Sequence, residues 1–262
     1  MRAEIPHTTE GAIGMTIPMR YGVTVLLTLA MFLAAGLLAA VLAKPAWAEN
    51  TLCEGTLPPG DYDNVVVPQG PRCYLSDSIV RGNVIALEHS SIAMVRDEVD
   101  GNVKALEQAD VIIIDSEVRG NVKGHRADAV GVLTSTVGKS IHIVGANVPG
   151  PFGPVAVSVH GTLLPKGNIH IERNTTLGVG IGNTTLEKGN VKVAGNVVHH
   201  PLFGLVIRAN QIAGNMQVFN NSGPAEKFVQ HNDIRAALRC FENTDPFIGG
   251  PNFAQKAEDQ CF

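Results

Sequence analysis

The chain has few aromatic residues and no run of positive charge. Phe, Tyr and Trp together make up 5% of the 262 residues, whereas glycine occurs 28 times. Average proteins use less glycine, so a conventional enzyme core rich in large rings is not the first expectation. Lys and Arg number 20 against 24 Asp and Glu, a net charge of −4, and they form no basic tract. We therefore expect no nucleic-acid partner.

Sequence motifs of catalysis and metal binding are also missing. There is no Gly-x-Ser-x-Gly elbow, no His-Glu-x-x-His pair and no phosphate-binding loop. The cysteines lie too far apart for the closely spaced pairs of a zinc site. We predict no catalytic residue, no metal ligand and no cofactor from these patterns.

The N-terminal region has the parts of an export signal. A positive charge precedes an uncharged apolar run from Tyr21 to Ala43, and the small residues Ala46 and Ala48 follow, which predicts cleavage before Glu49. The run is also long enough to cross a bilayer, so an uncleaved membrane anchor is the alternative for residues 1–48. Both interpretations place the rest of the chain outside the cytoplasm, because the positive charge precedes the run.

Four cysteines flank the exported part: Cys53, Cys73, Cys240 and Cys261. Four cysteines allow three disulfide connectivities. We favour local pairing, Cys53 with Cys73 and Cys240 with Cys261, because each bond then staples one end of the chain. Disulfides also fit an oxidising compartment outside the cytoplasm.

A repeat covers most of the exported part. The motif Gly-Asn-Val occurs at 82–84, 101–103 and 120–122, with a 19-residue interval, and we align Gly138-Lys139-Ser140 as a variant after 18 residues. Further copies occur at longer intervals, at 167–169, 189–191 and 214–216. Apolar residues, mainly Val and Ile, return at the same offsets in each copy.

Short alternating segments bounded by Gly and Asn are typical of strands and turns. A 19-residue unit of this kind predicts an all-β fold, a parallel β-helix or β-solenoid, in which strands of successive coils pair in parallel. We expect an N-terminal cap at 49–75, the solenoid at 76–239 and a C-terminal cap at 240–262. The count breaks near 145–166, where a Pro- and Gly-rich segment predicts a projecting loop.

Stacked coils would place like positions in rows. Asn83, Asn102 and Asn121 would form a hydrogen-bonded ladder, and we assign the preceding glycines to backbone freedom at a corner. Acidic residues would form two further rows, Glu88 on Glu107 on Arg126, and Glu98 on Glu117. We prefer a solvated surface at these like-charge steps, with a calcium site as the less favoured alternative.

The motifs resemble a group of mostly uncharacterised secreted bacterial proteins predicted as right-handed parallel β-helices. The matching features are Cys53-x-Gly55-x-Leu57-Pro58-x-Gly60, the Ser-x-Val-x-Gly-Asn-Val units at 78–84 and 116–122, and the ending Leu238-Arg239-Cys240-Phe241 with Gly249-Gly250-Pro251-Asn252. This resemblance implies a right-handed solenoid and a place in the bacterial cell envelope or outside the cell. It implies no activity and no catalytic residue.

The sequence thus predicts a non-enzymatic, extracytoplasmic solenoid with a structural or surface-adhesive role. Its partners would be polysaccharides or other envelope components, and membrane contact would come only from an uncleaved N-terminal segment. One alternative is a polysaccharide lyase or hydrolase that uses carboxylates on a face shared by Glu88, Glu107 and Glu117. Another is a self-assembling envelope polymer joined through unpaired end strands.

Overall fold

The computed structural model describes residues 49–147, 157–200 and 204–261 of the chain. The predicted export signal or anchor at residues 1–48 lies outside the described residues, and so does part of the predicted loop, residues 148–156. Residues Ala48–Phe262 form one compact unit, whose regular elements in the described parts are all strands. Those parts contain no helix with the length and apolarity that crossing a bilayer requires.

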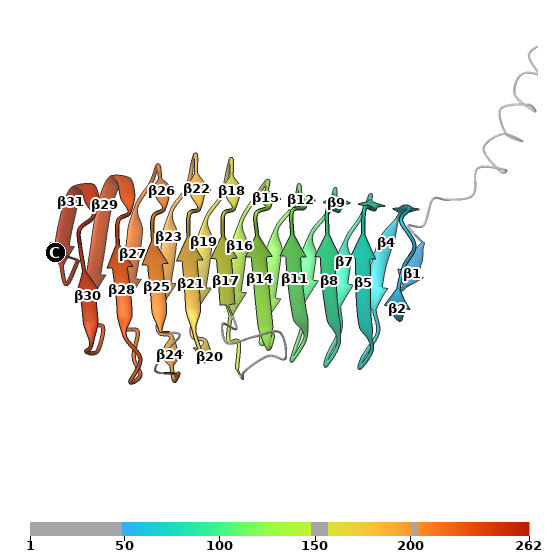
Figure 1. Cartoon of the computed structure of the whole chain (residues 1–262), viewed down its shortest axis with the longest axis horizontal. Helices are drawn as coiled ribbons and strands as arrows, with labels where there is room; N and C mark the ends of the chain where they lie inside the picture. Colours follow the sequence, from blue (N-terminus) through green and yellow to red (C-terminus); the bar gives the residue numbers. More distant parts are fainter. Residues whose placement is uncertain (1–48, 148–156, 201–203, 262) are drawn as a thin grey trace, which may run out of the picture. The chain divides into compact units, whose positions relative to one another are not determined.

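The unit is a parallel β-solenoid, as predicted (Figure 1). It has about ten turns. One side of each turn contributes a strand to a ten-stranded sheet, which we call the front sheet, and each strand pairs in parallel with the strand of the next turn. The front sheet consists of β2 (Gly55–Thr56), β5 (Arg72–Ser76), β8 (Ser91–Val95), β11 (Asp110–Ile114), β14 (Ala129–Leu133), β17 (Val157–His160), β21 (Val179–Gly182), β25 (Leu205–Arg208), β28 (Lys227–Gln230) and β30 (Phe247–Gly249).

A 19-stranded sheet supplies two more sides. Its longer side, the back row, contains β1 (Asn50–Leu52), β4 (Asn64–Val67), β7 (Val84–Ala86), β10 (Val103–Ala105), β13 (Val122–His125), β16 (Ile141–Val144), β19 (Ile169–Glu172), β23 (Val191–Ala194) and β27 (Met216–Phe219). Its narrow side, the short row, contains β3 (Asp61–Tyr62), β6 (Ile79–Val80), β9 (Glu98–Val99), β12 (Glu117–Val118), β15 (Thr136–Val137), β18 (Leu163–Leu164), β22 (Thr185–Leu186) and β26 (Gln211–Ile212). The long strands β29 (Asp233–Phe241) and β31 (Phe253–Asp259) pass through both rows and join them.

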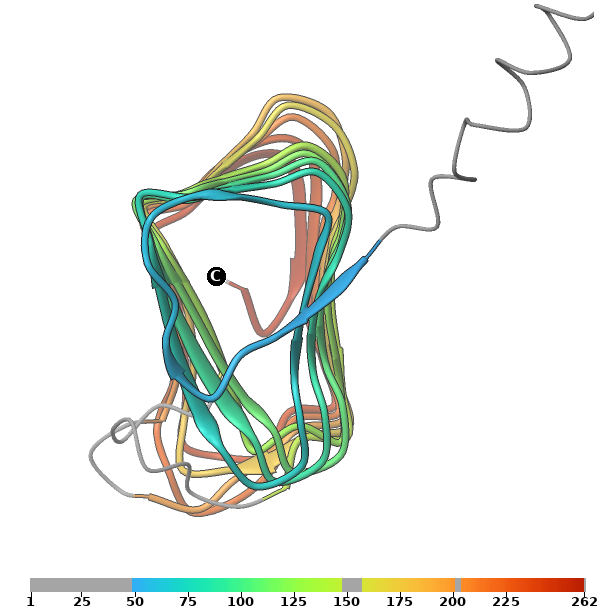
Figure 2. The same cartoon turned by 90° about the vertical axis from the view of Figure 1, so that its right-hand side faces the viewer.

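Viewed along the axis of the solenoid, successive turns lie over one another and share an elongated, four-sided outline (Figure 2). The front sheet and the back row form the two long sides, and the short row forms one narrow side. The fourth side consists of turns, to which later coils add the paired strands β20 (Thr175–Thr176) and β24 (Val197–Val198).

The predicted apolar columns fill the interior. Neighbouring residues of each strand point to opposite faces, so every second Val or Ile turns inward. The columns pair in register, and their members are at most 1% exposed: Val84, Val103 and Val122 in the back row, Ile92, Val111 and Val130 and also Met94, Ile113 and Val132 in the front sheet. The stacking of successive 19-residue windings is therefore confirmed.

The predicted asparagine ladder is also confirmed. The backbone N–H and the side-chain Nδ2 of Asn102 both donate to Oδ1 of Asn83 at 3.0 Å, and Asn121 makes the same two bonds to Asn102. Sequence reasoning missed two further ladders, which are enclosed in the fold. Their members are Asn174, Asn196, Asn221 and Asn243 in one, and Asn210, Asn232 and Asn252 in the other.

Glycine precedes the first ladder because the coils approach each other closely there. A Cβ atom at Gly101 would lie 2.2 Å from the carbonyl oxygen of Gly82, and one at Gly120 would lie 2.1 Å from that of Gly101. None of the three has a φ angle in the left-handed region. The predicted reason, backbone freedom at a corner, is wrong at these positions, and the requirement is steric.

The fourth copy of the repeat keeps the 19-residue interval. Ile141 pairs with Val122, so Ser140 takes the asparagine position and Lys139 the glycine position. The Ser140 N–H donates to Oδ1 of Asn121 at 3.2 Å, and its Oγ accepts the N–H of Asn168 at 3.0 Å. The predicted alignment of Gly138 with the repeated glycine is therefore wrong by one residue.

Later coils are longer, as the intervals in the sequence indicated. The next steps of this ladder span 28, 22 and 25 residues. Part of the added chain forms the corner that carries the buried asparagines at 174, 196, 221 and 243, next to β20 and β24.

Both predicted disulfides are present, one near each end. Cα atoms are 5.5 Å apart in Cys53–Cys73 and 5.2 Å apart in Cys240–Cys261, and all four side chains belong to the core. The residues assigned to caps, 49–75 and 240–261, continue the parallel pairing of the coils. The C-terminal segment contains β30 and β31, although its sequence shows little strand pattern.

Candidate functional site

The two predicted glutamate rows lie in different parts of the coil. Glu88 and Glu107 occupy turns between the back row and the front sheet, whereas Glu98 and Glu117 begin strands of the short row. The five-residue strand β11 separates Glu107 from Glu117, a span of about 16 Å. The single face expected to carry Glu88, Glu107 and Glu117 is therefore not formed.

In the first glutamate row, Arg126 neutralises Glu107. Arg126 Nη1 lies 2.8 Å from Oε1 of Glu107, and both side chains are exposed. Glu88 has longer contacts, 3.5 Å to the ring of His89 and 3.5 Å to the amide of Gln69. Exposed pairs of this kind add little stability, so this row is a solvated edge with balanced charge at one end.

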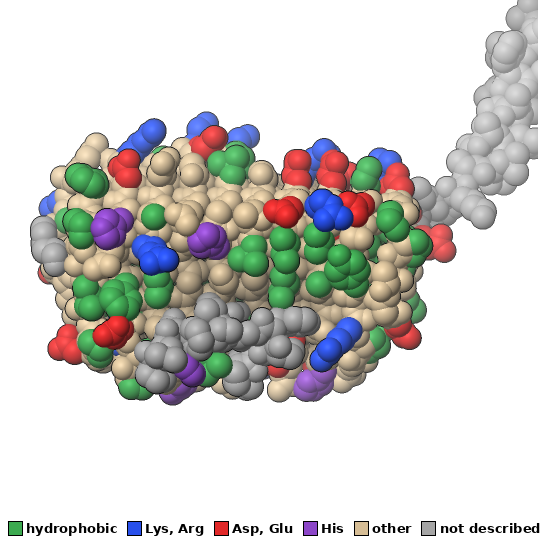
Figure 3. Space-filling view, viewed as in Figure 1, with side chains coloured by type: hydrophobic (Ala, Val, Ile, Leu, Met, Phe, Trp, Pro, Cys, Tyr) green, Lys and Arg blue, Asp and Glu red, His purple; other side chains and the backbone are tan. Residues whose placement is uncertain are grey.

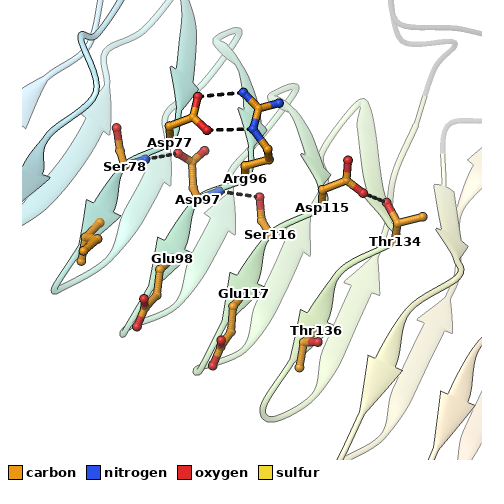
Figure 4. A pocket seen from close by; sticks show the side chains of 11 residues that line it. Asp77, Ser78, Arg96, Asp97, Glu98, Asp115, Ser116, Glu117, Thr134 and Thr136 are labelled. Carbon is orange, nitrogen blue, oxygen red and sulfur yellow. Dashed lines mark hydrogen bonds and ion pairs between the residues drawn. The ribbon is translucent and has the colours of Figure 1, made fainter.

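The second glutamate row lines a groove of about 560 Å³ along the edge between the front sheet and the short row (Figure 4). Both carboxylate oxygens of Asp77 accept hydrogen bonds from Arg96 at 2.7 Å, and Asp115 accepts one from the hydroxyl of Thr134. Arg119 lies against both glutamates of the row. The acidic residues that line the groove are Asp77, Asp97, Glu98, Asp115 and Glu117.

Asp97 is the buried carboxylate of this groove, with 3% of its surface exposed. Its two oxygens accept the backbone N–H groups of Ser78 and Val95, each at 2.9 Å, and its own N–H donates to the Ser116 hydroxyl at 3.0 Å. Burial raises the pKa of Asp97 to about 6, although these donors favour the charged form. Each of the five acidic residues in the groove thus already has a partner within the fold.

The histidines do not form a metal centre in the parts of the chain that the structure describes, where no three His, Cys, Asp or Glu side chains converge as ligands. The rings of His142 and His170 are neighbours on the back row, with centroids 5.7 Å apart. His160 belongs to β17 on the front sheet, where its Nε2 lies 2.9 Å from the amide of Asn183.

A row of basic side chains runs along the outer face of the back row, and we call it the basic row. Its members are successive partners in the parallel ladder: Lys104, Lys123, His142, His170, Lys192, Gln217 and Arg239. All are exposed or half-buried. Six coil steps of about 4.8 Å give the row a length of about 29 Å.

Within the described parts of the chain, acidic partners are present only toward the C-terminal end of the basic row. Oε1 of Glu172 lies 3.1 Å from Nζ of Lys192, and Oε2 of Glu258 lies 2.8 Å from Nε of Arg239. Lys104 and Lys123 have no ion-pair partner among the described residues. The N-terminal end of the row therefore carries two adjacent positive charges, Lys104 and Lys123, that are not compensated.

Sequence reasoning missed the basic row, although the repeat contains its signal. Five of the seven members directly follow Gly-Asn and an apolar residue, as in Gly-Asn-Val-Lys at 101–104 and 120–123 and Gly-Asn-Ile-His at 167–170. Because members are 19 or more residues apart, no basic tract exists in the linear sequence. Folding brings them into one line.

The other visible faces carry their charge differently. Over the front sheet, the surface is largely apolar or uncharged, and acidic and basic side chains gather along the edge formed by the short row (Figure 3). On that edge the two signs are paired across coils, as in Asp61 with Arg81 and Asp100 with Arg119.

Fold and surface together define a parallel β-solenoid with a linear basic face. No family model, curated protein or solved structure matches the chain.

Proposed function

We propose that the chain is an exported, non-catalytic β-solenoid that makes contact with polymers of the bacterial cell envelope. The supporting observation is a contrast between two surfaces. The acidic residues of the groove are all engaged within the fold, whereas Lys104 and Lys123 of the basic row have no acidic partner in the described residues. Catalytic carboxylates must be able to exchange protons or hold a metal, and a contact surface needs charge that is left for its partner.

Three features support a location outside the cytoplasm. The two disulfides fit an oxidising compartment. The charge and apolar run at the N-terminus have the pattern of an export signal, with a membrane anchor as the alternative. The resemblance of the repeat to secreted bacterial β-helix proteins points the same way.

Expression of the full chain in a bacterial host tests the export. We expect the protein in the periplasm or the medium, with both disulfides formed and Glu49 at the N-terminus. A protein retained in the cytoplasm with free thiols would overturn this part of the proposal.

Contact and catalysis are tested on the same purified protein. We expect it to sediment with isolated bacterial envelopes and to release no new reducing or unsaturated ends from a panel of polysaccharides, with or without calcium. Turnover that Glu107→Ala abolishes would establish the carbohydrate-active enzyme instead. No sedimentation with any envelope would contradict the contact role.

The open ends favour self-assembly as a second candidate. Sheet edges are exposed at β1 and at β30 and β31, and Leu52 and Phe253 near these edges are 62% and 75% exposed. Unpaired strands with apolar side chains can recruit further copies. Filaments in electron micrographs, more abundant after disulfide reduction, would support this candidate, and monomers under reducing conditions would contradict it.

A further inference from the structure

We infer that the basic row is a binding site for a linear anionic polysaccharide, which lies along the solenoid axis with its acidic groups over Lys104, Lys123, His142 and His170. This inference rests on the proposed contact function and names its ligand class.

The charge pattern of the row is unfavourable for the isolated protein. Lys104 is directly opposite Lys123 in the parallel ladder of the back row. Like charges on directly opposed residues of neighbouring strands destabilise a sheet. The fold therefore keeps at these positions a charge pattern that an acidic partner from outside would relieve.

The same chain pairs opposite charges where they serve the fold. Arg96 bonds Asp77 of the preceding coil at 2.7 Å, and Arg126 bonds Glu107 of the preceding coil at 2.8 Å. Compensation across coils is thus available to this repeat. At Lys104 and Lys123, which are direct partners in the ladder, it is absent, so two positive charges lie side by side.

The neighbouring column supplies polar groups for a sugar chain. Asn102 and Asn121 lie two residues before Lys104 and Lys123, on the same face of the sheet. Each amide uses one N–H in the ladder, at 3.0 and 2.9 Å, and an asparagine amide has two. The second N–H can donate to a carboxylate or hydroxyl group. Charged and amide groups therefore run side by side along the axis.

A polysaccharide fits the surface better than a nucleic acid does. Proteins that bind single strands stack bases on open aromatic faces. The aromatic rings beside the basic row are Phe219 and Phe241, which stack on each other with centroids 4.8 Å apart, and Lys192 lies over the ring of Phe219 at 5.4 Å. Both faces of Phe219 and one face of Phe241 are therefore engaged within the fold. A straight row of basic groups at one-coil intervals suits an extended chain with one acidic group on each sugar or each second sugar.

One histidine near the centre of the row, His170, makes the binding dependent on pH. His142 faces Lys123 on one side and His170 on the other, and His170 faces His142, Lys192 and the acidic Glu172. Burial lowers the pKa of His170; Glu172 opposes the shift, and His142 and Lys192 add to it. Protonation of His170 adds a positive charge between Lys123 and Lys192, so affinity should rise as the pH falls from 7.5 to 5.5.

The test measures binding of the purified full chain to polygalacturonate, to uncharged dextran and to a single-stranded DNA oligonucleotide by isothermal titration calorimetry. We expect binding to polygalacturonate that weakens with salt and strengthens at pH 5.5, and no binding to dextran. The double variant Lys104→Gln with Lys123→Gln should weaken binding at least about tenfold, because two charge contacts are lost. The matched control, Arg72→Gln with Arg208→Gln, removes the same charge from the front sheet and should change affinity less than about twofold.

Three outcomes would overturn the inference: no binding to polygalacturonate at low salt, equal losses in the two double variants, or tighter binding to the oligonucleotide than to polygalacturonate. Sedimentation with envelopes separates the two proposals. If the Lys104 and Lys123 variant still sediments like the wild type, the polysaccharide site is wrong while the contact function stands.

Discussion

Replacing Asn196 with alanine should cost much more stability than replacing Asn190 in the same coil, although the two side chains accept equivalent bonds. Oδ1 of Asn196 accepts the backbone N–H of Asn174 at 3.1 Å and its Nδ2 at 2.8 Å. Oδ1 of Asn190 accepts the same two groups of Asn215 at 2.8 and 3.1 Å. Asn196 is fully buried and Asn190 is exposed. The two sites differ in burial, and Asn196 also donates to the backbone oxygen of Ile171 at 3.1 Å, which adds to the cost of its loss.

The magnitude follows from the groups that each change leaves without a partner. Asn196→Ala removes the acceptor of two donors on Asn174, which is itself fully buried, so water cannot replace it. A buried unsatisfied donor costs about 1–3 kcal/mol, which predicts a loss of about 2–6 kcal/mol in the free energy of unfolding. At Asn190 water takes the place of the lost acceptor, and we expect a loss of about 1 kcal/mol or less.

Urea unfolding of the purified protein, followed by circular dichroism, measures both losses. The variant Asn196→Asp serves as a control, because it keeps an acceptor for Asn174 but places a carboxylate against Oδ1 of Asn221, to which the native amide donates at 2.8 Å. It should therefore not restore wild-type stability. Equal losses for Asn196→Ala and Asn190→Ala would refute the reasoning, since burial would then not set the cost of a ladder bond.

Three further predictions concern the corners and rows. Burial raises the pKa values of Asp97 and Asp110 to about 6, so each binds a proton more tightly in the folded than in the unfolded chain. The resulting stability is fully present below pH 3.8 and is lost as the pH rises through 6. The free energy of unfolding should increase by about 1 kcal/mol per group between pH 7 and pH 5, and a double variant with asparagine at both positions should lack this increase. Gly101→Ala should destabilise the protein by about 1–3 kcal/mol, whereas Gly131→Ala, whose Cβ would lie 3.7 Å from its nearest neighbour, should be neutral or slightly stabilising in the same urea assay. Lys123→Glu should raise stability by about 0.2–1 kcal/mol, because it removes the like-charge step to Lys104, while it weakens polygalacturonate binding; a less stable variant would contradict the charge argument.

The coil could be predicted because a solenoid repeats its environment. Equivalent sites in successive coils are occupied by Val84, Val103 and Val122. Because each site favours the same kind of residue, the 19-residue interval is visible in the sequence. The first asparagine ladder was predictable for the same reason. The 18-residue alignment failed because it was based on Gly138 and not on the ladder position. Serine can replace asparagine in the ladder, as Ser140 does through its hydroxyl.

The buried ladders and the basic row were not predictable by the same route. Asn174 and Asn196 belong to coils of unequal length, so no fixed interval relates them. The partner of a lysine such as Lys104 depends on which residues lie one coil away and on which side of the coil their side chains lie. The predicted face of Glu88, Glu107 and Glu117 failed at this point, since position around the coil depends on where strand β11 begins and ends.

Stacking in register has opposite consequences for different side chains. Unless the residue type alternates from coil to coil, each row places identical side chains next to one another. Valine columns gain packing from this arrangement, and asparagine columns gain hydrogen bonds. Charged residues lose by it, and on the short row the chain avoids the loss by placing Arg119 over Asp100. Along the basic row, Lys104 and Lys123 are not compensated in this way, although one acidic residue in the next coil would suffice. Stability alone does not explain such a row, whereas contact with an anionic partner does.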